Sequence, residues 1–184
     1  MKAVLALFIL LLFACNQPDH KTISNVPQVK QAFKPIDTSI YTILKLDKAN
    51  NYYFDKNVTP TTLSGDDILK IEYLVNKRVS EYNRIEKDSA ISITKRITKK
   101  KHDPNFTWTG DVIRNPAKYY KQLIPIINSK GEKEVWVNCF CTTAEKYYWK
   151  KDIVLVDDGG SCFFNLKINL TKGTVYDFMV NGMA

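Results

Sequence analysis

The sequence predicts an α+β domain in which one long helix packs on a curved antiparallel meander sheet, as in a cystatin-like or nuclear-transport-factor-like roll. Three observations support this class. One strand pattern spans residues 40–46, one helical pattern spans 64–86, and a series of β patterns separated by short turns spans 117–180. Short turns force successive strands to run antiparallel. Such a fold analogy says little about function.

The helical segment has a clear start and one apolar face. Ser64 is a good N-cap, and Asp66 and Asp67 lie in the first turn, where the helix dipole favours acidic side chains. Apolar residues then recur at spacings of three and four, at Ile68, Ile71, Val75, Val79 and Tyr82. We expect this face to pack in the core, and the weakly patterned residues that follow, up to 116, to be mostly loop.

The β patterns follow one another closely. Besides residues 40–46, we expect strands at 52–54, 119–128, 134–141, 153–156, 162–170 and 174–180. Pro125 has no N–H to donate, so it predicts a sheet edge or a bulge within its strand. Asp158-Gly159 predicts a two-residue hairpin turn.

The N-terminus has the pattern of a bacterial lipoprotein signal. Lys2 precedes an apolar run of eleven residues, Ala3 to Phe13, and the run ends at Leu12-Phe13-Ala14-Cys15. Spanning a bilayer takes about 20 apolar residues, so the run fits the core of a signal peptide and not a membrane span. We expect residues 1–14 to be removed and Cys15 to carry the lipid.

The rest of the chain divides into a tether and one domain. Residues 15–38 are polar after the lipid-bearing cysteine and contain three prolines, as expected of a flexible tether. Residues 39–184 are long enough for a single α+β core. The predicted location is the bacterial cell envelope, with the protein anchored to a membrane and facing the periplasm or the cell surface.

The basic charge of the chain is mostly dispersed. The formal net charge is +8, and removal of Lys2 with the signal leaves +7. The only dense basic run is 95–102, which we interpret as a solvated loop, with attraction to anionic lipid headgroups as the alternative. Because a nucleic-acid surface combines clustered base with aromatic side chains, we expect no nucleic-acid partner.

The C-terminal half resembles a family of small bacterial lipoproteins. The residues that carry the resemblance are Tyr119-Tyr120-Lys121-Gln122-Leu123-Ile124-Pro125, the segment from Gly131 to Cys141 with its Trp136-Val137-Asn138-Cys139-Phe140-Cys141, the segment from Val156 to Phe164 with its Asp157-Asp158-Gly159-Gly160-Ser161-Cys162, and the closing Asn181-Gly182-Met183-Ala184. With the helix, they cover most of residues 64–184. The resemblance implies a shared fold and export route, and no activity.

Three cysteines remain once Cys15 is lipidated. Disulfides are allowed outside the cytosol, so we expect either Cys139 or Cys141 to bond Cys162 and the other thiol to be buried. The alternative is three free cysteines in the core. Cys-x-Cys spacing without a nearby histidine does not favour a zinc site or a cysteine nucleophile, so no metal, cofactor or catalytic residue is expected.

Aromatic residues are the candidates for binding. Trp108, Tyr120, Trp136, Tyr148 and Trp149 exceed what one small core requires, so some of them are expected to line a ligand pocket or a protein-binding patch. The alternative is ordinary packing in the core and at its rim.

Together these features predict a non-enzymatic envelope lipoprotein. Its domain is expected to bind a small ligand or an envelope protein as a monomer, and an inhibitor or immunity role is one form of such binding. Two alternatives remain open. One is an enzyme with a small-molecule pocket in the cone between helix and sheet, and the other is a structural component of the envelope.

Overall fold

A computed structural model of the 184-residue chain describes residues 38–48, 50–99, 105–142 and 148–182. The chain divides into two compact units, Met1–Lys34 and Pro35–Ala184, and all described residues belong to the second. The expected signal peptide, the lipidation site Cys15 and the tether up to residue 37 lie outside the described residues. Within the described ranges, no helix is long and apolar enough to cross a membrane.

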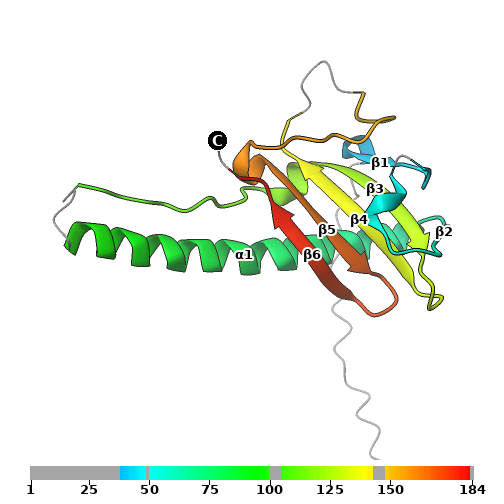
Figure 1. The fold of residues 1–184 in the computed structure, drawn as a ribbon, viewed down its shortest axis with the longest axis horizontal. Coiled ribbons are helices and arrows are strands. Elements are labelled where there is room, and N and C mark those ends of the chain that lie inside the picture. Colours follow the sequence, from blue (N-terminus) through cyan, green and yellow to red (C-terminus); the bar gives the residue numbers. More distant parts are fainter. Residues whose placement is uncertain (1–37, 49, 100–104, 143–147, 183–184) are drawn as a thin grey trace, which may run out of the picture. The chain divides into compact units, whose positions relative to one another are not determined.

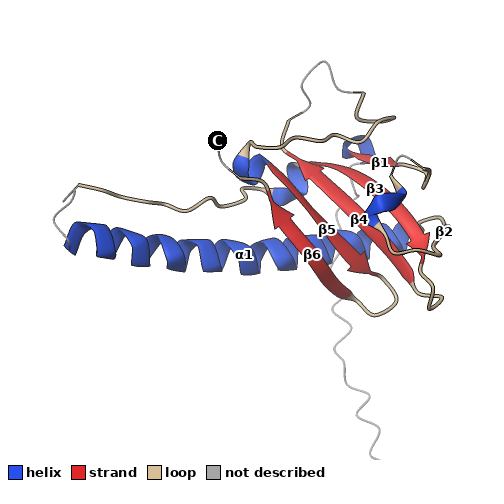
Figure 2. Cartoon of the chain, in the orientation of Figure 1, coloured by secondary structure: helices blue, strands red, loops and turns tan. Residues whose placement is uncertain are grey.

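The domain is of the α+β class, as predicted, with one long helix, α1, spanning Gly65–Lys99. A six-stranded sheet has the order β1-β3-β4-β5-β6, with β2 paired to β3 (Figures 1 and 2). The strands are β1 Tyr41–Ile43, β2 Thr59–Pro60, β3 Tyr120–Ile127, β4 Lys133–Phe140, β5 Phe163–Asn169 and β6 Thr174–Val180. Short 3₁₀ helices are η1 Thr38–Ile40, η2 Asn51–Tyr53, η3 Pro116–Lys118 and η4 Gly160–Cys162.

The sheet is mixed and open, which corrects the expectation of a curved, wholly antiparallel sheet. Strands β3 to β6 form the predicted antiparallel meander. Strand β1, however, pairs in parallel with β3, with Tyr41 opposite Lys121. The long connection through α1 returns the chain in the same direction, as parallel pairing requires.

Pro125 lies inside β3, in the gap between the residues that pair with β1 and those that pair with β2. It is not at the edge or bulge that we expected. Its carbonyl accepts a hydrogen bond from the N–H of Thr61. The missing N–H of Pro125 therefore faces the side of β1 and β2. Pairing with β1 ends at Leu123, and pairing with β2 covers only Ile126 and Ile127. Proline is tolerated because no ladder hydrogen bond is needed at this point.

Apolar side chains fill the interface between α1 and the sheet. Ile71 and Val75 from α1, and Leu123 and Val137 from the sheet, are all 0% exposed. Their packing confirms the apolar face that the sequence predicts for the helix. These side chains fill the middle of the helix–sheet interface, and a hollow of about 330 Å³ lies at its rim, between α1 and the β5–β6 hairpin.

Two loops cover part of the opposite face of the sheet. A second apolar cluster of Leu44, Ile124 and Trp136 lies beneath the loop that follows β1. Residues 148–156 pass beside this cluster. Their carbonyls accept hydrogen bonds from two buried amide side chains of the sheet, Gln122 and Asn138. Nε2 of Gln122 donates to the carbonyls of Trp149 and Asp152, at 2.6 and 2.7 Å. The 148–156 segment is thereby fixed to β3 without strand pairing.

Helix α1 continues thirteen residues beyond its predicted end at residue 86, which corrects the expected loop. Its second half extends past the sheet, and residues 105–113 return alongside it (Figure 1). Ala90 is 3% exposed, and Thr94 Oγ1 accepts a hydrogen bond of 3.0 Å from the N–H of Trp108. Contacts with a distant segment stabilise this part of the helix, and a local pattern does not reveal them.

Three smaller expectations were also wrong. The 52–54 segment is mostly the 3₁₀ turn η2, and residues 153–156 form no strand although Val154 is buried. Asp158-Gly159 is not a two-residue hairpin turn. Gly159, with a φ of +95°, instead leads into η4.

Candidate functional site

A polar cleft of about 330 Å³ lies on the face of the sheet opposite α1, where the β3–β4 and β5–β6 turns meet. The side chains that line it come from the loop before β2, from the two turns, and from the outward-facing positions of β4, β5 and β6. They are Phe54, Asp55, Val58, Asn128, Ser129, Lys130, Glu132, Glu134, Lys167, Asn169, Lys172, Thr174, Tyr176 and Asp177.

Two glutamates at the base of the cleft share two amide donors. Nδ2 of Asn128 donates to Oε1 of Glu134 at 2.9 Å and to Oε2 of Glu132 at 3.2 Å. Nδ2 of Asn169 donates to Oε2 of Glu132 at 2.7 Å and to Oε1 of Glu134 at 3.0 Å. The two amides therefore hold the carboxylates side by side and join the two turns.

The remaining carboxylate oxygens are engaged by groups from the β5–β6 hairpin. Nζ of Lys172 lies 2.7 Å from Oε1 of Glu132. The phenol of Tyr176 donates to Oε2 of Glu134 at 2.8 Å. Every carboxylate oxygen of this pair thus accepts at least one hydrogen bond or ion pair from the protein, which fixes the orientation of both side chains.

The pKa shifts of Glu132 and Tyr176 move both groups further from titration near neutral pH. Hydrogen bonds from Lys172, Asn128 and Asn169 lower the pKa of Glu132 to about 2. Burial and the hydrogen bond to Glu134 raise the pKa of the Tyr176 phenol well above its usual value. A general acid or base works best with a pKa near the operating pH. Glu132 and Tyr176 are therefore suited to holding a ligand and not to exchanging protons with it.

The cleft presents both donors and acceptors with nearly balanced charge. Its lining contains four acids, Asp55, Glu132, Glu134 and Asp177, and three lysines, Lys130, Lys167 and Lys172. Nζ of Lys167 lies 2.9 Å from Oδ2 of Asp177, so one ion pair bridges β5 and β6 within the cleft. Within the described residues, no three histidine, cysteine or acidic side chains converge to hold a metal ion.

The aromatic candidates from the sequence do not form one site. Trp136 is 2% exposed and stacks on Tyr53. Tyr120 and Trp149 pack together, with ring centroids 5.2 Å apart. Trp108 lies beside the distal half of α1, and Tyr148 is 75% exposed. None of the five candidates lines the polar cleft.

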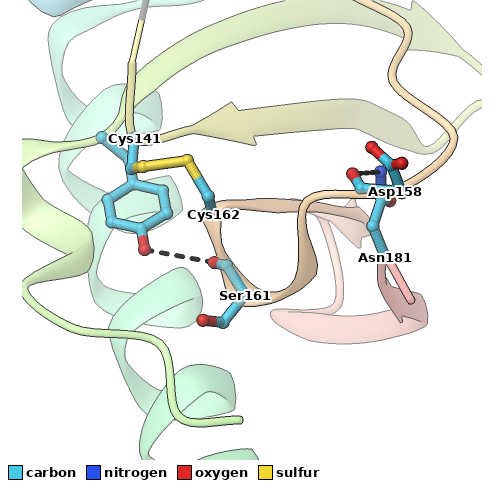
Figure 3. The surroundings of a disulfide bond; sticks show 6 residues. Cys141, Asp158, Ser161, Cys162 and Asn181 are labelled. Atoms are coloured by element: carbon cyan, nitrogen blue, oxygen red, sulfur yellow. Dashed lines mark hydrogen bonds between the residues drawn. A yellow bond between two sulfur atoms is a disulfide. The ribbon is translucent and has the colours of Figure 1, made fainter. Parts of the chain in front are cut away.

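The structure joins Cys141 to Cys162 in a disulfide, between the end of β4 and the end of η4 (Figure 3). Beside it, the phenol of Tyr119 donates to the carbonyl of Ser161 at 3.1 Å. Cys139 is a free, buried thiol on the helix-facing side of β4. Burial is the main cause that raises its pKa to about 12.

Sequence reasoning missed the residues of the cleft. A signal was present, because Glu134 and Tyr176 are polar positions that alternate with apolar ones in two adjacent strands. Alternation identifies the outward face of a strand. It does not show which outward side chains meet across strands, and Asn128 and Asn169 reach Glu134 only once the two turns are side by side.

No family model, curated protein or solved structure matches the chain in comparisons with known proteins. Inference about function therefore depends on the geometry of the cleft and on the sequence of the N-terminus.

Proposed function

We propose that this protein is a lipid-anchored lipoprotein of the bacterial envelope whose α+β domain binds a ligand or partner without transforming it. The observation that carries the proposal is the polar cleft, in which Glu132 and Glu134 are oriented by four neighbouring side chains. Side chains that are already ordered lose little entropy when a ligand arrives, so such a cleft is prepared for binding.

The anchor follows from the lipobox at Leu12-Phe13-Ala14-Cys15. Cys15→Ser is expected to abolish metabolic labelling with palmitate and to move the protein from the membrane fraction to the soluble one. Cys139→Ser, which changes a buried cysteine of the domain, is the matched control and keeps the label. Unchanged labelling of Cys15→Ser would contradict the anchor.

Binding in the cleft is tested with a charge reversal that leaves the shared amide network in place. The lipidated protein in detergent is incubated with envelope extract, and bound molecules are identified by mass spectrometry. Lys167→Glu is expected to lose what the wild type retains. Lys77→Glu changes an exposed lysine of α1 that does not line the cleft. This variant is expected to retain the same molecules as the wild type.

If nothing is retained by the wild type, or if Lys167→Glu retains the same molecules, the binding role of the cleft is wrong. Retention of an envelope hydrolase together with loss of its activity would identify the inhibitor or immunity form of the proposal. A stable homo-oligomer that retains no other molecule would instead favour a structural envelope component.

A further inference from the structure

Two further hollows lie along the loop that follows β1, and they share lining residues with the polar cleft or with each other. A hollow of about 590 Å³ shares Phe54, Asp55 and Val58 with the cleft. A third hollow, of about 300 Å³, shares Asp47 and Tyr52 with the second. Each hollow therefore adjoins the next, and we call the three together the groove. A groove of this extent suits a chain-like ligand better than a single small molecule.

Tyr52 is an exposed aromatic platform where the second and third hollows meet. Its side chain is 61% exposed, and its ring centroid lies 4.1 Å from that of Tyr53. Tyr53 stacks in turn on Trp136 at 4.0 Å. Because Trp136 is 2% exposed, this column of three rings connects the surface platform to the core.

The loop that carries the platform is held in place by hydrogen bonds. Asn50 is 4% exposed, and its Nδ2 donates to the carbonyl of Lys45 at 2.9 Å. Its Oδ1 accepts from the N–H of Asp47 at 2.9 Å. The turn that carries Tyr52 is therefore fixed before a ligand arrives. Orienting the ring on binding then costs little entropy.

The chemistry of the groove fits a neutral polyhydroxylated chain. Hydroxyl groups donate to carboxylates and amide oxygens and accept from lysines, so they match a cleft with four acids and three lysines. A polyanion would meet the acids, and a polycation would meet the lysines. The flat C–H face of a sugar ring packs on an exposed aromatic ring, as Tyr52 provides.

We propose that the groove binds a neutral oligosaccharide, with one sugar stacked on Tyr52 and others hydrogen-bonded in the cleft beside Lys167 and Tyr176. This inference rests on the proposed binding function and names its ligand class. It assigns the affinity to two places, the cleft and the platform. A short saccharide fills one of them, and a longer one fills both.

The test uses the full-length lipidated protein in detergent micelles and isothermal titration calorimetry. The probes are disaccharides and hexasaccharides of glucose, xylose, mannose and N-acetylglucosamine, with a sulfated hexasaccharide as the charged comparison. At least one neutral hexasaccharide is expected to bind about 10-fold more tightly than its disaccharide, which corresponds to about 1.4 kcal/mol. Tyr52→Ala is expected to weaken hexasaccharide binding about 3- to 10-fold, the range of one aromatic contact.

Matched variants separate the platform from general effects. Tyr52→Trp retains an aromatic surface and is expected to restore hexasaccharide binding. Tyr73→Ala removes a tyrosine that is 66% exposed on α1 and is expected to leave affinity unchanged. Circular dichroism of each variant checks that the fold is intact.

Several outcomes overturn the inference. The platform is wrong if Tyr52→Ala binds hexasaccharides as tightly as Tyr73→Ala does. The ligand class is wrong if no neutral saccharide binds, or if the sulfated probe binds more tightly than every neutral one. The proposed function survives these failures if envelope extract still yields a molecule whose retention depends on Lys167, and falls if it does not.

Discussion

At the scale of single residues, Lys121 is a charged side chain that is 0% exposed. Its Nζ lies 3.2 Å from Oε1 of Glu72 and donates to the carbonyls of Tyr119 and Pro116, at 3.0 and 3.1 Å. The phenol of Tyr41 also donates to Glu72. All three N–H bonds of the ammonium thus have an acceptor, which is what makes burial of the charge tolerable.

Loss of the partner of Lys121 is expected to destabilise the domain strongly. Glu72→Ala leaves a buried charge without its counter-ion and is expected to lower the free energy of unfolding by about 3 kcal/mol. Glu81→Ala, which removes an exposed glutamate from the same helix, is expected to cost less than about 1 kcal/mol. Urea unfolding measures both, and equal losses would contradict the role assigned to Glu72.

The double variant Glu72→Met with Lys121→Met tests how the charge is satisfied. An apolar pair often replaces a buried ion pair at little cost. Here the carbonyl of Tyr119 loses the ammonium as its donor, whereas the carbonyl of Pro116 keeps the N–H of Tyr119. The double variant is therefore expected to remain about 1–3 kcal/mol less stable than the wild type, the cost of one buried carbonyl that loses its side-chain donor. Full recovery in urea unfolding would show that water replaces the ammonium.

Glu132 predicts a specific acid sensitivity. Its folded pKa of about 2 lies below its ordinary value of 4.5. A lowered folded pKa contributes stability that is fully present above pH 4.5 and is lost as the pH falls toward 2. The free energy of unfolding of Glu132→Gln is therefore expected to depend less steeply on pH in this window than that of the wild type. Urea midpoints between pH 2 and 5 measure the effect, with Glu81→Gln as control, and equal slopes would contradict it.

At the scale of elements, local patterns predicted what local chemistry determines. The first half of α1 has a cap and an apolar face, β3 lies in an apolar and aromatic run, β5 alternates, and Gly131 and Gly173 mark the two turns, so these elements were predictable. The second half of α1 was not, because Ala90 is its one buried residue and the half-buried residues around it, Glu86, Ile93, Thr94 and Ile97, mix polar with apolar side chains. These residues are covered by a segment far along the chain.

The residues of the candidate site were not predictable for a similar reason. Asn128, Glu132 and Asn169 lie in or next to turns, where polar residues are ordinary and carry no special signal. Their meeting depends on the register of two hairpins, in which Glu134 lies opposite Asn169. The aromatic residues attracted attention in the sequence because they are large. Of the five candidates, however, only Trp136 is buried in the core.

Two glycines test how the distal half of α1 is held. Gly110 has a φ of +76°, and a Cβ there would lie 3.0 Å from the carbonyl oxygen of Glu86. Gly131 has a φ of +77° with nothing within 4 Å of such a Cβ. Gly131→Ala is therefore expected to cost about 1 kcal/mol for the left-handed backbone alone, and Gly110→Ala about 1–2 kcal/mol more for the added clash.

Hydrogen exchange locates the two effects. Gly110→Ala is expected to increase amide exchange in residues 86–98 and 105–113 while β3 to β5 remain protected, because the distal part of α1 extends past the sheet and, in the described residues, is hydrogen-bonded to the returning segment. Gly131→Ala is expected to affect only the β3–β4 turn. Increased exchange throughout the sheet in Gly110→Ala would show that the distal helix and the core unfold as one unit.

At the scale of the whole molecule, the open face of the sheet is shaped by how its coverings are attached. The 148–156 segment is fixed by Gln122 and Asn138, whose amides bond its carbonyls, and the Cys141–Cys162 disulfide closes the base of the same excursion. The loop after β1 is fixed by Asn50 and by the stack of Tyr53 on Trp136. These attachments hold the two loops against the cluster of Leu44, Ile124 and Trp136, and the cleft lies beside them, where the β3–β4 and β5–β6 turns meet.

The disulfide links the stability of the domain to the compartment in which it folds. Its cysteines are separated by 21 residues, and closing a loop of this length contributes about 3 kcal/mol in the chain-entropy model. We therefore expect residues 15–184 to have a free energy of unfolding about 3 kcal/mol lower when they are made in a reducing cytosol than when they are exported to an oxidising periplasm. Urea unfolding of both preparations measures this, and a Cys141→Ser, Cys162→Ser variant should unfold alike from either compartment. If the wild-type preparations unfold at the same urea concentration, or if two extra thiols react in the exported protein, the bond does not stabilise the fold.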